Sequence, residues 1–172
     1  MQEVLSPRAD RSKSALIAQK LTTAVHEHRI LPGMKLSEEE VGEIFDVSRT
    51  IVRQALRRLE HDGLLTIERN KGAFVARPTV KEAREVFEAR ALLEPRTARA
   101  AAERITPNDI ARLERHLEDE HAALDSGDTG TALKLSGAFH IQIARIADQA
   151  TIEAFIRQLV ARSSLVVALY WR

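Results

Sequence analysis

One predicted helix, over residues 48–62, has two chemically different sides. One side carries long basic or hydrogen-bonding side chains: Thr50, Arg53, Gln54 and Arg57. The opposite side carries apolar side chains: Val52, Ala55, Leu56 and Leu59. An α-helix fits the major groove of B-DNA, where the guanidinium group of arginine pairs bidentately with guanine or binds a phosphate. The pattern therefore predicts a helix that contacts DNA, and an ordinary solvated helix face is the alternative.

Basic residues are concentrated around this helix, although the whole chain is nearly neutral. The 172 residues have a formal net charge of +1, but residues 48–77 contain seven basic and three acidic residues. A compact basic region is expected for a surface that binds a polyanion. The charge distribution therefore favours nucleic acid as a partner.

The helix over residues 48–62 is the third of three predicted helices. The first is expected over residues 12–28, where apolar residues recur at helical spacing. The second begins after Ser37, whose hydroxyl can cap it and which three glutamates follow. A tight turn at residues 46–47 leads to the third helix, which Ser48 can cap and Gly63 ends.

A β-hairpin is predicted directly after the three helices. Two short β-type runs, residues 64–67 and 73–75, flank a polar segment whose Asn70 and Gly72 suit positive φ. Three helices followed by a hairpin predict a winged helix-turn-helix domain over residues 12–77. A disordered tail over residues 1–11 is expected before it, and a linker over residues 78–80 after it.

The second half, residues 81–172, contains only helical patterns and predicts an all-α bundle. Helices are expected over residues 80–103, from Thr106-Pro107 to residue 124, over 131–147, and from a cap at Thr151 onward. The apolar run 165–171 needs a covering surface, so either another subunit covers it or the bundle is C-terminally incomplete in this chain. The predicted fold class is mainly α: a winged helix-turn-helix joined to an all-α bundle.

Composition limits the class of protein and its compartment. Hydrophobic residues make up 44% and charged residues 30% of the chain, which predicts a soluble globular protein with its own core. The absence of cysteine excludes disulfides, thiolate zinc sites and thiol nucleophiles. No apolar run approaches the ~18 residues of a membrane span, and the N-terminus is unlike a signal peptide. We expect no membrane partner and a cytoplasmic location.

Residues 31–77 resemble the DNA-binding domain of the GntR family of bacterial transcription regulators. Five segments carry the resemblance: LPG (31–33), VSRT (47–50), VRQAL (52–56), LEHDGL (59–64) and NKGAFV (70–75). Ile51 departs from the family pattern, because many members carry proline there.

This resemblance implies roles for eight residues. Arg49 and Arg53 would contact bases and the DNA backbone. Ser48 and Thr50 would contact phosphates. The hairpin residues implied at the minor groove are Arg69, Asn70, Lys71 and Gly72. For Gly72 the alternative role is that of a turn glycine.

The helical half resembles the FCD effector domain of the FadR-type branch of this family. The segment FEARALLEP (87–95), the alanines at 98, 101 and 102, and the Phe139-His140 pair carry the resemblance. It implies a helical bundle that encloses a small carboxylate effector, often beside a divalent metal such as zinc. Arg90 would bind the effector carboxylate, and His140 would line the pocket and bind the metal. The alternatives are a salt bridge from Arg90 to Glu94 or Glu114, and a plain polar role for His140.

The metal-binding pattern of the FCD domain is incomplete in this chain. The family places an aspartate four residues before the first histidine ligand, but position 136 is serine. The two later histidines of the family pattern fall beyond residue 172. We therefore expect metal binding through His140 to be weak or absent, with the effector held by Arg90 directly.

Together these features predict a ligand-responsive regulator that binds double-stranded operator DNA. We expect a homodimeric repressor that a small organic acid releases from its operator. The alternatives are a helical adaptor that does not bind DNA and a small helical metalloenzyme. The chain lacks a glycine-rich phosphate loop, a His-Glu-x-x-His helix and a nucleophile elbow, so no enzymatic activity is predicted. Organic acids, sugar acids, amino acids and fatty acyl groups all remain open as effectors.

Overall fold

The computed structural model describes residues 8–27 and 29–170. The chain divides into two compact units, one of residues 1–25 with 29–76 and the other of residues 26–28 with 77–172. This division falls next to the predicted boundary at residue 77. The fold is mainly helical with one small sheet, which confirms the predicted fold class.

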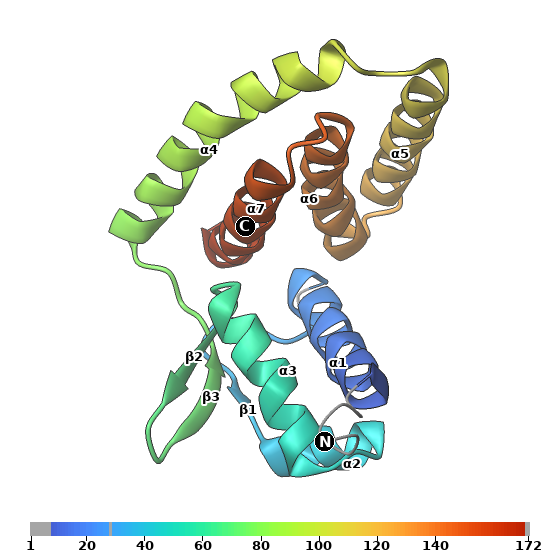
Figure 1. Ribbon diagram of the computed structural model, residues 1–172. Helices are drawn as coiled ribbons and strands as arrows, with labels where there is room; N and C mark the ends of the chain where they lie inside the picture. Colours follow the sequence, from blue (N-terminus) through green and yellow to red (C-terminus); the bar gives the residue numbers. More distant parts are fainter. Residues whose placement is uncertain (1–7, 28, 171–172) are drawn as a thin grey trace. The chain divides into compact units, whose positions relative to one another are not determined.

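The N-terminal unit is a winged helix-turn-helix (Figure 1). Its elements are α1 (Arg8–His26), β1 (Lys35–Leu36), α2 (Glu38–Phe45), α3 (Arg49–His61), β2 (Leu65–Glu68) and β3 (Gly72–Val75). The three strands form an antiparallel sheet in the order β1-β3-β2. Strand β1 was not predicted. Helix α1 begins at Arg8, so residues 8–11 are helical and the predicted tail is wrong there; residues 1–7 lie outside the described residues.

The ends of α2 and α3 determine where α3 starts. Ser37 caps α2 by accepting a hydrogen bond from the Glu40 backbone N–H at 3.3 Å, as predicted. Asp46 ends α2 in the left-handed conformation, with φ of 48°. The predicted side-chain cap at Ser48 is wrong, because its hydroxyl makes no capping hydrogen bond and only its carbonyl begins the helix. Gly63 has φ of 75° and directs the chain into β2.

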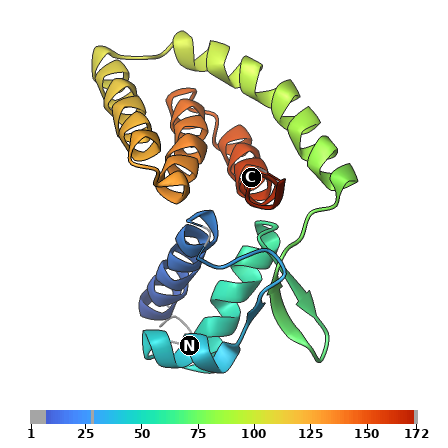
Figure 2. The same cartoon turned by 180° about the vertical axis from the view of Figure 1, so that it is seen from behind.

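The predicted apolar face of α3 forms part of the core of this unit. The side chains of Val52, Ala55, Leu56 and Leu59 are at most 2% exposed. Ile51 is also buried, so the residue that departs from the family pattern contributes to the core. The hairpin lies beside α3 in both ribbon views (Figure 2). Asn70 (φ 64°) and Gly72 (φ 107°) turn the chain between β2 and β3, as their residue types predict.

The second unit contains the four predicted helices. They are α4 (Val80–Ala102), α5 (Pro107–Asp125), α6 (Thr129–Ile146) and α7 (Ala150–Tyr170). Capping boxes at Thr79 and Thr106 begin α4 and α5. Helix α7 begins at Ala150, so the predicted cap at Thr151 is wrong. Helix α4 packs on α6 and α7, and α5 packs on α6.

The apolar run near the end of α7 is buried at its first two residues and half-buried at residues 167–169. Leu165 is 0% and Val166 is 7% exposed, so the prediction that this run needs another subunit or further residues is wrong for them. Tyr170 is 56% exposed and donates a hydrogen bond to the Pro78 carbonyl at 3.3 Å, while Trp171 lies outside the described residues. Among the described residues, no helix combines the length and apolar composition that crossing a membrane requires.

Candidate DNA-binding and effector-binding sites

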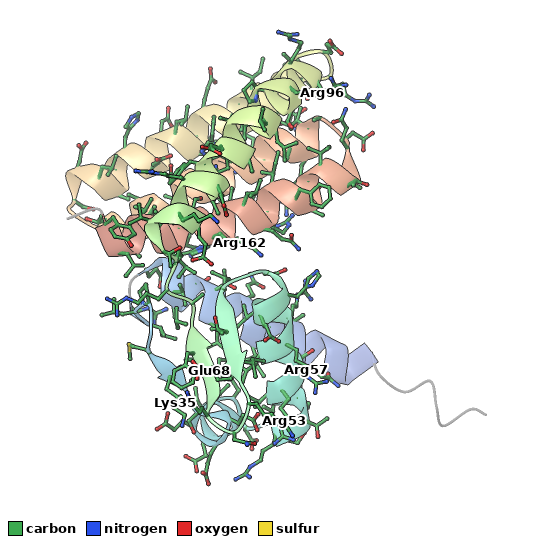
Figure 3. All side chains as sticks on the ribbon, turned by 90° about the vertical axis from the view of Figure 1, so that its left-hand side faces the viewer. Lys35, Arg53, Arg57, Glu68, Arg96 and Arg162 are labelled. Atoms are coloured by element: carbon green, nitrogen blue, oxygen red, sulfur yellow. The ribbon has the colours of Figure 1, made fainter. Side chains whose placement is uncertain are left out.

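The polar face of α3 is exposed and carries arginines that keep free donor groups. The Arg53 side chain is 61% exposed, and its Nε donates to Glu38 Oε2 at 2.8 Å and Oε1 at 3.0 Å. Neither of the two Nη groups of Arg53 donates a hydrogen bond to a residue that the structure describes. Arg57 projects from the same helix into solvent (Figure 3). This face therefore presents guanidinium N–H groups that can donate hydrogen bonds to a base edge or a phosphate.

The first residues of α3 and its N-cap are also polar and exposed. Ser48 and Thr50 are exposed, and the Ser48 hydroxyl is not used as a helix cap. Arg49 Nη2 lies 3.6 Å from Glu39 Oε1, and both side chains are about two-thirds exposed. Exposed ion pairs of this kind are worth less than about 1 kcal/mol. The glutamates of α2 therefore orient the side chains of Arg49 and Arg53. Both arginines can still exchange these weak ion pairs for contacts with DNA.

The hairpin presents a second basic surface. Arg69, Asn70 and Lys71 are exposed at its tip. Lys71 Nζ lies 2.8 Å from Glu68 Oε2, and this hydrogen bond and charge raise the pKa of Lys71. Lys71 is therefore a cation at neutral pH.

Phe74 and Gly72 of the hairpin both lie against Lys35 of β1. Lys35 Nζ lies 6.0 Å from the centre of the Phe74 ring. A Cβ on Gly72 would come within 3.2 Å of Lys35 Cε, and its φ of 107° disfavours any other residue. Gly72 is thus a turn glycine, and its contact with DNA stays a prediction.

In the second unit, Arg90 and His140 line one cavity, together with Glu94. This cavity, the candidate effector cavity, has a volume of about 370 Å³ and lies between α4, α6 and α7. Its apolar lining includes Phe139, Ile143 and Ile156. Small-molecule sites have this form: mainly apolar walls with a few convergent polar groups.

The polar groups of the candidate effector cavity form one connected network. Arg90 Nε donates to Glu94 Oε1 at 2.7 Å, and Arg90 Nη1 donates to the Ser163 hydroxyl at 2.7 Å. His140 Nδ1 lies 3.2 Å from Glu94 Oε2. Burial raises the pKa of Glu94, but the hydrogen bonds from His140 and Arg90 outweigh it and hold the pKa below its ordinary value. Glu94 is therefore a carboxylate at neutral pH.

Both units of the chain match known protein families. Residues 13–75 match the family described as bacterial regulatory proteins, gntR family, and residues 85–172 match the FCD domain. The chain belongs to the GntR family. The predicted resemblance to GntR regulators with an FCD domain is confirmed.

Individual GntR relatives agree with this assignment. Over 143 residues the chain is 31% identical to the Nta operon transcriptional regulator of Aminobacter aminovorans, covering 82% of this chain and 67% of that protein. It is 34% identical to the HTH-type transcriptional repressor RspR of Escherichia coli, covering 69% of this chain and 52% of RspR. The chain thus spans about half to two thirds of these relatives. The structure of E. coli McbR/YncC matches 92% of this chain and 75% of that chain with a TM-score of 0.83, and at 23% identity it supports the fold alone.

The described residues do not fit the divalent metal of the GntR-FCD pattern. His140 is turned toward Glu94, and Ser136 lines a different cavity from His140. Within residues 8–27 and 29–170, no three histidine, aspartate or glutamate side chains are grouped as metal ligands. Metal binding at His140 stays a prediction, and no step of the function below depends on it.

Sequence reasoning missed three residues of these GntR sites. Glu38 was interpreted only as a helix-start residue, yet its carboxylate holds Arg53. Glu94 was weighed only as an alternative partner of Arg90, and the structure also brings it to His140. Ser163 lies 73 residues from Arg90 in sequence, and no local pattern indicates their contact.

Proposed function

We propose that this GntR chain binds double-stranded operator DNA and that a small carboxylate effector changes its affinity for that DNA. The observation that carries the proposal is the exposed face of α3, where Arg53 and Arg57 face solvent opposite a fully buried apolar face. A winged helix-turn-helix that inserts α3 into the major groove would bring this face against base edges.

In this proposal the eight predicted residues keep their roles. Arg49 and Arg53 contact bases and the DNA backbone, while Ser48 and Thr50 contact phosphates. The tip of the hairpin lies at the minor groove through Arg69, Asn70, Lys71 and Gly72. The exposure of the seven residues other than Gly72 and the positive charge of Lys71 support such contacts.

The effector would bind in the cavity between α4, α6 and α7. Arg90 supports this role because a guanidinium stays charged when partly buried and binds a carboxylate. His140 would contribute a second polar group. We propose repression with release on effector binding, because the relative RspR is named a transcriptional repressor. We place the protein in the cytoplasm, where operator DNA is accessible.

A dimer follows from the size of the DNA contact. One α3 helix covers only a few base pairs, so a useful operator needs two copies on a two-fold related site. We propose that the helical half holds the two copies together. An effector then acts by favouring one dimer geometry, with a coupling of typically ~1–3 kcal/mol.

The test is a selection of bound duplexes from a random pool, followed by fluorescence anisotropy with the selected duplex. Arg53→Ala should weaken binding to this duplex by ~1–3 kcal/mol, because Arg53 is expected to contact a base. Arg96→Ala is the matched control: Arg96 is an exposed arginine on α4, and its loss should leave the affinity unchanged (Figure 3). Equal affinities of the folded Arg53→Ala and Arg96→Ala variants would refute the assigned face.

A further inference from the structure

The candidate effector cavity contains one fixed positive and one fixed negative charge. The side chains of Arg90 and Glu94 are 15% and 25% exposed, and they are in direct contact. His140 adds a charge only when it is protonated. The cavity lining is therefore electrically neutral when His140 is neutral.

This neutrality disfavours a ligand whose only charge is a carboxylate. Such a ligand would bring a second negative charge close to the Glu94 carboxylate, whose side chain is only 25% exposed. Two like charges in a partly buried site disfavour each other, and an uncompensated buried charge is costly. Glu94 cannot relieve the conflict easily, because its hydrogen bonds from His140 and Arg90 favour the ionised form.

The unused hydrogen-bonding groups of the network define what the ligand must carry. Arg90 uses Nε for Glu94 and Nη1 for Ser163, and its Nη2 makes no hydrogen bond to the described residues. The two oxygens of Glu94 receive one described partner each, which leaves each with a further lone pair. The cavity therefore offers a cationic donor and an anionic acceptor side by side.

The remaining wall of the cavity is apolar. Phe139, Ile143 and Ile156 come from α6 and α7, and Pro95 and Ala98 come from α4. A volume of about 370 Å³ lies within the range of small-molecule sites. An apolar group attached to the charged end of the ligand would be buried against these side chains.

We propose that the effector of this chain is an α-amino acid with an apolar side chain. Its carboxylate binds Arg90 Nη2, its ammonium group binds Glu94, and its side chain packs on Phe139, Ile143 and Ile156. A zwitterion brings its own compensating charge, so the occupied cavity stays neutral. This inference rests on the proposed function, in which the cavity is the effector site, and it names the class of effector.

The test compares amino acids with analogues that lack one charge. L-Phenylalanine is compared with 3-phenylpropanoate, which lacks the amine, and with phenethylamine, which lacks the carboxylate; L-leucine is compared with 4-methylpentanoate and isopentylamine. Isothermal titration calorimetry is performed on the whole 172-residue chain. At least one of the two amino acids should bind about tenfold or more tightly than both of its analogues, because each analogue leaves one buried charge unmatched.

Glu94→Gln is the decisive variant, since it keeps the side-chain shape and removes the negative charge. It should abolish the preference for the amino acid over its deaminated analogue. Glu88→Gln removes an exposed carboxylate from the same helix and should keep the preference. Arg90→Ala should weaken binding of both the amino acid and the carboxylate analogue.

The comparison of amino acids with their analogues on the wild-type protein tests the inference even if a variant does not fold. Binding of the deaminated acid as tightly as the amino acid, or no binding of either amino acid, would overturn it. Anisotropy with the selected duplex is measured in parallel. Intact DNA binding together with failure of the ligand test overturns this inference alone, whereas loss of specific DNA binding overturns the proposed function.

Discussion

At the scale of single residues, both sites share one arrangement: a glutamate holds the Nε of an arginine and leaves other donor atoms available. Glu38 holds Arg53 in the N-terminal unit, and Glu94 holds Arg90 in the helical unit. The first pair is exposed and exchangeable, while the second is partly buried. A long side chain that is already oriented loses less entropy on binding, which favours specific over non-specific contacts.

Glu38→Gln should lower the specificity of DNA binding. The variant loses the carboxylate that orients Arg53 and also a negative charge close to the expected DNA phosphates. Binding to a scrambled duplex should therefore tighten, and the ratio of specific to non-specific affinity should fall by up to about fivefold, the range of an exposed ion pair. Anisotropy titrations with both duplexes measure this ratio.

Glu43→Gln is the control for this prediction. Glu43 is exposed on the same helix, so its substitution removes the same charge without touching Arg53. If both variants change the specificity ratio equally, Glu38 acts only through its charge and does not position Arg53.

At the scale of elements, local sequence determined most of the fold. The N-caps at Ser37 and Thr106 and the positive-φ residues Asn70 and Gly72 were predicted, because each depends on a side chain and its nearest neighbours. Strand β1 was missed because its two residues form a strand only by pairing with β3, almost forty residues away.

The same distinction explains the candidate sites. The face of α3 could be predicted because it depends on one helical period. The common cavity of Arg90 and His140 was implied by family resemblance alone. The contacts of Glu94 with His140 and of Arg90 with Ser163 depend on the register between α4, α6 and α7, which no local pattern specifies.

The capping box of α5 gives a prediction about stability. Thr106 accepts a hydrogen bond from the Asp109 backbone N–H at 3.2 Å, and Asp109 Oδ2 accepts from the Thr106 backbone N–H at 3.1 Å. Thr106→Ala should lower the free energy of unfolding by about 1 kcal/mol, the usual value for a lost N-cap. Thr106→Ser keeps the hydroxyl and should cost much less. Urea denaturation of the three proteins measures the difference, and equal losses in Ala and Ser would show that the cap contributes nothing.

This cap should also depend on pH. The side-chain hydrogen bond from Thr106, followed by its backbone N–H, lowers the pKa of Asp109 below its ordinary value of 3.8. A carboxyl group with a lowered pKa stabilises the folded state above its unfolded pKa and loses this effect as the pH falls through its folded pKa. The difference between wild type and Thr106→Ala should therefore be full at neutral pH and shrink below about pH 3.8.

At the scale of the whole molecule, the two units have separate tasks that dimerisation would join. The N-terminal unit carries the candidate DNA contacts, and the helical unit carries the candidate effector cavity. A ligand in one unit can change DNA binding by the other only if the two dimer states bind it with different affinity.

We expect two copies of the chain on each selected duplex. Analytical ultracentrifugation should give a dimer for the free protein at tens of micromolar and a complex of two chains with one duplex. The selected sequence should contain two related half-sites about one helical turn apart, because the two α3 helices enter successive major grooves. A monomer under all conditions, with one chain bound per duplex, would contradict the dimer.

The salt dependence of DNA affinity tests the central claim most directly. Binding through Arg49, Arg53 and the basic hairpin, as proposed, would neutralise phosphates and release counterions. The affinity for the selected duplex should therefore fall steeply and linearly in a plot of log K against log salt concentration. Lys71→Ala should reduce the slope by about 1 and weaken binding to all sequences alike. A wild-type affinity that is independent of salt, or equal for the selected and scrambled duplexes at every salt concentration, would contradict the account.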